Sequence, residues 1–178
     1  MDFPQVESSR RDDPLPQRRR LPHVVPLWVD PQASAYFITI NCQKRATNQL
    51  ALAEIAKPLL DSVRFRNERF VWFAHIFLIM PDHVHALLSF PSCGPLSPGR
   101  DGRLGEASPP HTIQQTISLW KRWTALQLKV QWQRDFFEHR LRSEENWRQK
   151  ADYIWDNPVR KGLVKNAQDW PYVFFPLR

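Results

Sequence analysis

The chain has 178 residues, of which 42% are hydrophobic and 24% charged, as in ordinary globular domains. A net charge of +7, from 25 Lys and Arg against 18 Asp and Glu, favours a polyanionic partner, nucleic acid before membrane. The two cysteines, Cys42 and Cys93, lack metal-ligand or redox spacing and predict reduced thiols in a cytoplasmic protein. The start of the chain lacks the apolar stretch of a secretory signal, and the apolar run Phe70–Met80 is too short to span a bilayer. These features predict a soluble protein without a membrane partner.

Composition divides the chain into an arm and one domain. Residues 1–33 contain six prolines and scattered charges without a period, which predicts a flexible Pro-rich N-terminal arm. Residues 91–111 hold four of the five glycines and five prolines, which predicts a long flexible loop. We therefore expect a single domain over residues 34–178 that contains this loop.

The first half of the domain predicts a strand, a helix and a hairpin. The aromatic and β-branched residues of 35–42 (AYFITINC) are typical of a strand. Apolar residues at helical spacing predict an amphipathic helix over about 50–67, in which Pro58 indicates either a kink or a late start with the proline in the first turn. The two apolar runs within 70–90 predict a hairpin that closes at Pro81-Asp82.

The second half predicts two further helices and a strand. A helix over about 112–131 carries an apolar stripe expected to face the core: Leu119, Trp123, Leu126 and Val130. A short strand is expected at 135–141. The last helix is expected to run from its N-cap, Ser143, to Asp156, because Pro158 disfavours helical geometry at the residue before it. The buried stripe of that helix is expected to contain Trp147, Ala151, Ile154 and Trp155.

This order of elements predicts the fold class. Strand, helix, strand, strand, helix, strand is the order of a ferredoxin-like split βαβ arrangement. We therefore expect an α+β fold with a four-stranded antiparallel sheet and two helices on one face. The other face remains free for a substrate and for the extra C-terminal helix.

Two histidines at the start of the second hairpin strand form a candidate metal site. Alternate side chains of a strand point to the same face, so His83 and His85 are expected side by side. Neutral imidazole is a common ligand of divalent metal ions. The alternative is that both are ordinary strand residues.

The last helix adds a candidate nucleophile. Asn146, Lys150, Tyr153 and Asn157 fall on one flank of this helix. A tyrosine side chain, with an ordinary pKa of about 10, is a weak nucleophile at neutral pH. A divalent cation that polarises a phosphoryl oxygen makes its attack on a phosphodiester feasible. Tyr172 and Tyr36 are rival nucleophiles, although their apolar surroundings favour a packing role.

Two motifs resemble a known family. Residues 80–85 (MPDHVH) resemble the His-hydrophobic-His signature of the HUH endonucleases. Residues 153–164 (YIWDNPVRKGLV), followed by 169–172 (DWPY), resemble the YIxxNPVRxGLV…DWPY ending of the REP-associated tyrosine transposases, a branch of the single-tyrosine transposase superfamily. The resemblance covers about residues 35–175, and the motifs occur in family order.

The resemblance implies a HUH core in which His83 and His85 bind the metal, Tyr153 is the nucleophile, and Asn157 completes the metal site. It also implies Mg²⁺ or Mn²⁺ as cofactor and single-stranded REP hairpin DNA as substrate. Cleavage would then leave a 5′-phosphotyrosine link and a free 3′-hydroxyl. Asn157 has a structural interpretation as well, because an Asn before Pro is a natural cap for a further turn. The family leaves open whether the chain acts as a monomer or a homodimer.

Basic and aromatic residues supply candidate DNA contacts. Residues 111–165 contain eleven Lys and Arg against six acids. The candidate phosphate contacts are Lys121, Arg122, Arg140, Lys150, Arg160 and Lys161. Tryptophans 120, 123, 132 and 155 are candidates for stacking on unpaired bases where they are exposed. His75 is expected to be a core residue, and His139 is left unassigned. Two alternatives remain: a non-catalytic hairpin-binding module of the same fold, and a small metal-dependent hydrolase.

Overall fold

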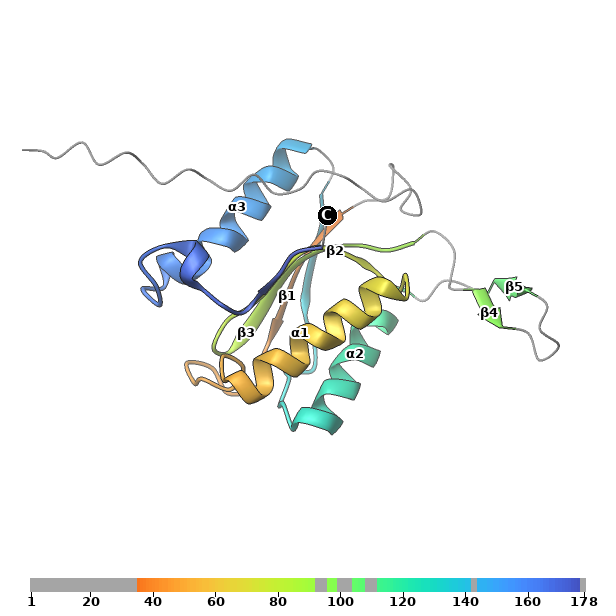
Figure 1. The fold of residues 1–178 in the computed structure, drawn as a ribbon, viewed down its shortest axis with the longest axis horizontal. Helices are drawn as coiled ribbons and strands as arrows, with labels where there is room; N and C mark the ends of the chain where they lie inside the picture. The colour runs from red at the N-terminus through yellow and green to blue at the C-terminus, as the bar shows by residue number, and fades with distance from the viewer. Residues whose placement is uncertain (1–34, 92–95, 99–103, 108–111, 142–143, 177–178) are drawn as a thin grey trace, which may run out of the picture.

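The computed structural model describes residues 35–91, 96–98, 104–107, 112–141 and 144–176. A five-stranded antiparallel sheet with the order β6-β1-β3-β2-β7 forms its centre (Figure 1). The strands are β1 (Ala35–Asn41), β2 (Phe73–Ile79), β3 (His83–Ser89), β6 (Phe137–Arg140) and β7 (Val173–Phe174). Helices α1 (Ala53–Glu68) and α2 (Ile113–Leu128) cover one face, and α3 (Glu144–Arg160) covers the other. A short 3₁₀ helix, η1 (Ala167–Asp169), precedes β7.

The α+β, ferredoxin-like fold is confirmed, and its central sheet has one strand more than expected. The first four strands of the sheet and the placement of the three helices agree with the split βαβ prediction. The fifth strand, β7, pairs with β2 through Phe77 opposite Phe174 and Leu78 opposite Val173. Two residues are too few to show a strand period, so only tertiary pairing makes this segment a strand.

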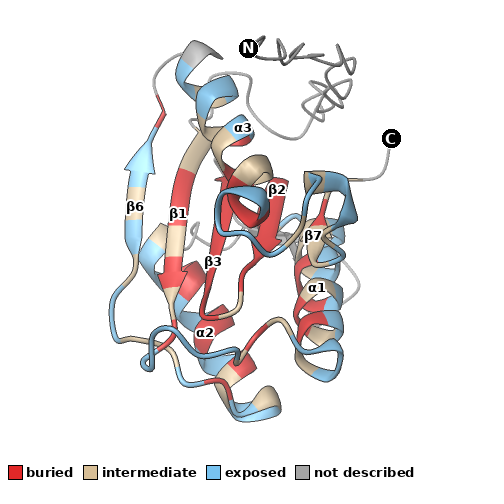
Figure 2. Ribbon diagram, turned by 90° about the vertical axis from the view of Figure 1, so that its left-hand side faces the viewer, coloured by how far each residue is buried: buried red, intermediate tan, exposed pale blue. Residues whose placement is uncertain are grey.

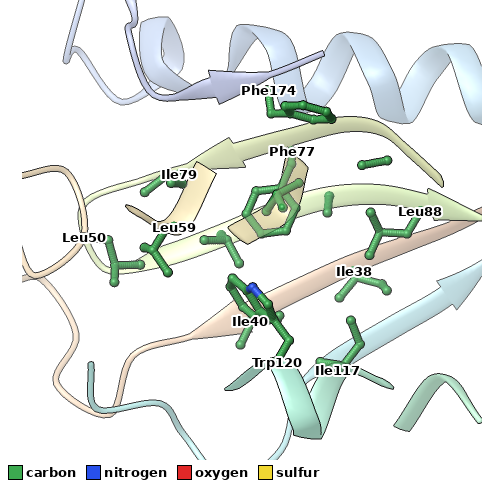
Figure 3. Packing of buried hydrophobic residues seen from close by; sticks show 14 of the residues in the cluster. Ile38, Ile40, Leu50, Leu59, Phe77, Ile79, Leu88, Ile117, Trp120 and Phe174 are labelled. Atoms are coloured by element: carbon green, nitrogen blue, oxygen red, sulfur yellow. The ribbon is translucent and has the colours of Figure 1, made fainter. Parts of the chain in front are cut away.

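The sheet carries apolar side chains on both faces. Every residue of β2 and β3 is buried, because helices cover both sides of these central strands (Figure 2). Toward α1 and α2, Ile38, Ile40, Phe77 and Trp120 belong to one cluster (Figure 3). Toward α3, Phe37, Leu78 and Leu87 pack with Ala151 and Ile154. The second cluster fixes α3 against the face that carries the histidine pair.

The predicted core face of α2 is wrong by about one residue position. The helix buries Thr116, Ile117, Trp120, Lys121 and Thr124. Of the predicted stripe, Leu119, Trp123 and Leu126 are exposed, and Val130, just beyond the helix, is buried as expected. Polar residues occupy the buried face because they have partners there. The Trp120 indole donates to Ser62 Oγ of α1 at 2.9 Å, and Thr124 Oγ1 accepts from the Trp132 indole at 2.9 Å.

The predicted end of the last helix is also wrong. Helix α3 continues through Pro158 to Arg160. It then closes with Leu163 N donating to Pro158 O and Gly162 N donating to Val159 O, both at 2.9 Å. These two bonds form a Schellman motif, which needs the left-handed backbone that Gly162 adopts at φ 67°. The late motif therefore extends the helix by one turn and keeps Asn157 inside it.

Prolines and loops account for the other differences. Helix α1 begins at Ala53, so Pro58 lies inside the helix and not in its first turn. The predicted loop at 91–111 contains a two-stranded hairpin, β4 (Leu96–Pro98) with β5 (Leu104–Ala107). The arm predicted for residues 1–33 lies outside the described residues. The domain limits, and the flexibility of the arm and loop, stay predictions.

Candidate active site

The histidine pair lies on the α3 side of β3. His83 and His85 are both buried, and their ring centroids are 4.7 Å apart. The hairpin places them together because residues two apart on a strand share a face. The prediction of two adjacent imidazoles on one strand face therefore agrees with the structure.

Each imidazole has a hydrogen-bond partner at Nδ1. Asp82 Oδ1 accepts from His83 Nδ1 at 2.6 Å, and His85 Nδ1 lies 2.8 Å from Thr39 Oγ1 on β1. The Asp82 carboxylate can only accept, so His83 carries its proton on Nδ1 and presents the lone pair of Nε2 to a ligand. The Thr39 hydroxyl fixes the orientation of the His85 ring. A carboxylate partner of this kind orients metal-binding histidines in many proteins.

The surroundings favour the neutral form of both rings. Burial lowers the pKa of His85 to about 3, and the nearby positive charges of Arg45, Lys150 and Lys161 add to this effect. Burial also lowers the pKa of His83, although the hydrogen bond to Asp82 opposes the shift. Neutral imidazoles have the free lone pair that a metal ion requires.

Tyr153 of α3 faces the same site. Its ring centroid lies 5.6 Å from that of His85 and 6.0 Å from that of Phe37. Phe37 in turn stacks on His85 at 5.5 Å, so the three rings form one contiguous cluster. The buried neighbours Ala151 and Ile154 hold α3 on the sheet and thereby fix the position of the phenol.

The rival tyrosines lie elsewhere. Tyr36 and Tyr172 pack against the cluster beneath α1 and α2, on the opposite face of the sheet from Tyr153. Tyr36 contacts Phe90, and Tyr172 contacts Trp170. Both have the packing role that their apolar surroundings favoured.

Asn157 contains a buried polar atom without a partner. The residue is 3% exposed, and its Oδ1 accepts no hydrogen bond from any described residue. It lies one helical turn after Tyr153, and its backbone carbonyl accepts the Lys161 N–H at 3.0 Å in the continuing helix. The predicted capping role is therefore wrong, because Asn157 is a helix-interior residue. A buried carbonyl oxygen without a donor is unusual in proteins and suits a cation ligand.

The residues present fit a small divalent cation. Two neutral imidazoles and one amide oxygen, from His83, His85 and Asn157, offer the mixed nitrogen and oxygen donors that suit Mn²⁺ and a weakly held Mg²⁺. Within the described residues, no group of three or more His, Cys, Asp or Glu is placed to hold a metal. A closed zinc site is thus not formed by the described part of the chain.

Three of the predicted basic residues gather at this site. Lys150 Nζ lies 4.9 Å from the Phe37 ring and 5.7 Å from the Tyr153 ring, and Arg160 Cζ lies 4.9 Å from the Tyr153 ring. Lys161 is exposed and close enough to influence both histidines. Lys150 and Arg160 thus lie next to the phenol, and Lys150 and Lys161 act electrostatically on the histidine pair.

The other three basic candidates lie away from Tyr153. The prediction that Lys121 contacts a phosphate does not agree with the structure. Lys121 is buried, its Nζ donates to Arg134 O at 2.7 Å, and it lies over the Phe136 ring. Its ammonium is thus held inside the protein and is not available to a phosphate. Arg122 is exposed on α2, which covers the opposite face of the sheet. Arg140 lies on β6 opposite Tyr36, whose ring also packs toward α1 and α2.

The sequence prediction missed a group of supporting residues. Arg45, in the connection between β1 and α1, forms an ion pair with Asp82 at 3.3 Å and a short hydrogen bond to Asn41. Asp82 Oδ2 also accepts the Ala46 N–H at 2.7 Å. Burial alone would raise the pKa of Asp82, but the hydrogen bond from His83, the Ala46 N–H and the charge of Arg45 outweigh it and lower the pKa. A carboxylate directly before His83 could have indicated this supporting role. The sequence pattern around Asp82 predicts only a turn.

Two other histidines, His75 and His139, and one cysteine, Cys42, lie among the described residues outside the candidate site. His75 is buried, and its Nε2 lies 2.8 Å from Ser89 Oγ, as expected for a satisfied core residue. His139 is exposed on β6. Cys42 is a buried free thiol, and burial raises its pKa to about 12.

No helix among the described residues is both long and apolar enough to cross a membrane.

A ferredoxin-like sheet presents two adjacent histidines to a tyrosine-bearing helix. This arrangement agrees with the HUH core that the resemblance of the two motifs implies. No family model matches the chain. Individual known proteins are nevertheless similar to it in sequence and in fold.

The chain is similar to the REP-associated tyrosine transposase of Escherichia coli, with 27% identity over 145 residues, 81% of this chain and 78% of that protein. A relative from Haemophilus influenzae is 27% identical over 140 residues, 79% of this chain and 78% of its own length. The solved structure of a REP-associated tyrosine transposase bound to a REP hairpin shares the fold, with a TM-score of 0.59 and 21% identity over 84% of this chain and 81% of that one. These findings confirm the resemblance to the REP-associated tyrosine transposases that the two motifs predicted.

Proposed function

We propose that this chain is a metal-dependent single-stranded DNA transesterase that cleaves and rejoins REP-like hairpin DNA. The observation that carries the proposal is the contact between Tyr153 and His85, whose ring centroids are 5.6 Å apart across two elements distant in the sequence. The names of the relatives, and the REP hairpin bound in the solved neighbour, support hairpin DNA as the substrate.

The reaction exchanges one phosphodiester bond for another. The phenolic oxygen of Tyr153 attacks the phosphorus, the bond from phosphorus to the 3′ oxygen breaks, and the phenol releases a proton while the 3′ oxygen gains one. The product strand is linked to Tyr153 through its 5′ phosphate. Attack by a 3′-hydroxyl on this link reverses the step and rejoins strands, so no external energy source is needed.

The chain's own residues prepare this step. Lys150, Arg160 and Lys161 supply positive charge for the phosphate next to the phenol. The packing of α3 and the contact with Phe37 hold the ring beside the histidine pair, which reduces the entropy cost of attack. His83, His85 and Asn157 would hold Mg²⁺ or Mn²⁺, which polarises a phosphoryl oxygen when bound.

One chain supplies every residue of the proposed site. Tyr153 and His85 come into contact within a single protomer. This contact supports action by a monomer in cis, and it makes a homodimer that exchanges tyrosines unnecessary.

The proposal is tested by covalent adduct formation. Labelled single-stranded hairpin DNA is incubated with the chain and Mg²⁺ or Mn²⁺, and a protein–DNA band that survives SDS is expected. Tyr153→Phe should abolish this band and leave hairpin binding nearly intact. Tyr172→Phe is the matched control and should form the adduct normally, because Tyr172 packs on the opposite face.

Three other outcomes would contradict parts of the proposal. Hairpin binding without any adduct from the unmodified chain would indicate a non-catalytic hairpin-binding module. Cleavage that persists in Tyr153→Phe would indicate a hydrolase that uses water. Cleavage that resists EDTA would remove the metal from the proposal.

A further inference from the structure

An exposed aromatic ring lies on the same sheet face as the proposed active site. Phe137 of the edge strand β6 is 55% exposed. Phe137 is paired with Thr39 of β1, and Thr39 is paired with His85 of β3. Directly paired residues of antiparallel strands point to the same face, so the three side chains form one row across the sheet. Two strand spacings, about 10 Å, separate His85 from Phe137.

Phe137 extends the ring cluster of the active site. Its ring meets Phe37 edge to face, with 6.2 Å between the centroids. Phe37 contacts both His85 and Tyr153. An isolated exposed hydrophobic residue is ordinary on a protein surface. Phe137 differs because its exposed ring continues, without a break, from the rings around the proposed nucleophile.

Polar groups continue the same path beyond Phe137. A hollow of about 490 Å³ is lined by Glu138, His139 and Arg140 of β6 and by Asn146 of α3. His139 is paired with Phe37 and therefore shares its face. Asn146 belongs to the α3 flank that continues through Lys150 to Tyr153. The hollow therefore lies between edge strand β6 and helix α3, and of its β6 residues His139 is the one that shares the face of Phe137.

We propose that Phe137 stacks on an unpaired base of the bound DNA strand, close to the phosphate that Tyr153 attacks. The inference rests on the proposed function, because the strand it describes is the substrate of that site. An exposed aromatic ring beside cationic side chains is the common platform for single-stranded nucleic acid, since every base has a π face. About 10 Å corresponds to roughly three nucleotides of a stacked strand, because such a strand rises about 3.4 Å per nucleotide along its axis. Lys150, over the Phe37 ring, would contact the backbone along this path.

The test measures binding to an imperfect DNA hairpin that carries an unpaired flank. The same hairpin with its flank paired to a complementary strand is the comparison DNA. All binding is measured in the full-length Tyr153→Phe chain, so that no strand is cut. Phe137→Ala, Phe137→Trp and the matched control Phe65→Ala are added to it. Phe65 is 54% exposed but lies on α1, on the opposite side of the sheet.

Phe137→Ala should weaken binding of the unpaired-flank hairpin by roughly 5- to 150-fold, which corresponds to the loss of one stacked base. Phe137→Trp should retain binding, and Phe65→Ala should have no effect. The slope of affinity against salt should not change in Phe137→Ala, because a neutral side chain releases no counterions. With 2-aminopurine at successive flank positions, one position should be quenched on binding and should regain its fluorescence in Phe137→Ala.

Three results would overturn the inference. The Phe137→Ala and Phe65→Ala variants could bind the unpaired-flank hairpin with equal affinity. Phe137→Ala could lose as much affinity for the paired flank as for the unpaired one, or it could change the oligomeric state and leave DNA affinity unchanged. The thermal midpoint of each variant shows that it is folded. Adduct formation, assayed separately with Tyr153 intact, tests the proposed function. A missing adduct together with a Phe137-dependent preference for the unpaired flank would overturn the chemistry and retain the stacking site.

Discussion

Replacing Asn157 by leucine separates stability from function. Asn157 is 3% exposed, and no described residue donates to its Oδ1. A buried polar atom without a partner costs about 1–3 kcal/mol of stability. Leucine removes this oxygen and keeps the branched shape, although its larger methyl groups crowd the site. We therefore expect the metal-free variant to gain about 1 kcal/mol, or roughly 2–4 °C in thermal midpoint for a chain of this size.

The metal response should change in the opposite direction. If Asn157 is a ligand, Mn²⁺ at about 100 times its Kd stabilises the unmodified chain by about 2.7 kcal/mol. Asn157→Leu should lose most of this stabilisation and should form no covalent adduct. Thermal unfolding with and without Mn²⁺ measures both effects in the same samples.

Asn67→Leu is the matched control for the sign of the effect. Asn67 Oδ1 accepts the Ala74 N–H at 2.8 Å, so its replacement leaves a backbone donor unpaired and should lower stability by about 1–3 kcal/mol. The reasoning is refuted if Asn157→Leu destabilises the metal-free chain as much as Asn67→Leu does and retains the Mn²⁺ response.

Two further predictions concern Asp82 and His75. Asp82→Asn should weaken Mn²⁺ binding about 10- to 100-fold, measured by calorimetry, because the charged partner of His83 is lost. Asp61→Asn, which alters an exposed ion pair on α1, should leave Mn²⁺ binding unchanged, and equal losses in both variants would contradict the orienting role of Asp82. Burial lowers the pKa of His75 from 6.5 to about 4, so the unfolded chain binds this proton more readily than the folded one. The corresponding stability, about 3 kcal/mol, is present above pH 6.5 and is lost as the pH falls toward 4. Between pH 6.5 and 4, urea unfolding should show a smaller loss of stability for His75→Gln than for the unmodified chain, by about 3 kcal/mol. An identical pH dependence in the two proteins would contradict a lowered pKa of His75.

Local patterns predicted the elements whose residues depend mainly on their neighbours in the chain. The two apolar runs around Pro81-Asp82 predicted the β2–β3 hairpin, and the strand period placed His83 and His85 side by side. Helical spacing placed Lys150, Tyr153 and Asn157 on one flank of α3. Each of these predictions needs only the geometry of one element.

Predictions that depended on contacts between elements were less accurate. The choice of the buried face of α2 depended on Ser62 of α1 and on Trp132, which accommodate the polar groups of Trp120 and Thr124. Hydrophobicity alone selected Leu119 and Trp123, which are exposed. The extension of α3 past Pro158 depended on a hydrogen-bonded closure at Gly162 that outweighs the local preference of a residue before proline.

The sequence by itself determined the strand that carries the imidazoles and the helix that carries the phenol, because periodicity is a property of one segment. Only the tertiary structure decided that His85 and Tyr153 lie in contact. It also brought Arg45 to Asp82 and removed Lys121 from the surface. The physical reason is that packing two apolar faces of one sheet fixes how separate segments approach one another, and no local pattern contains that information.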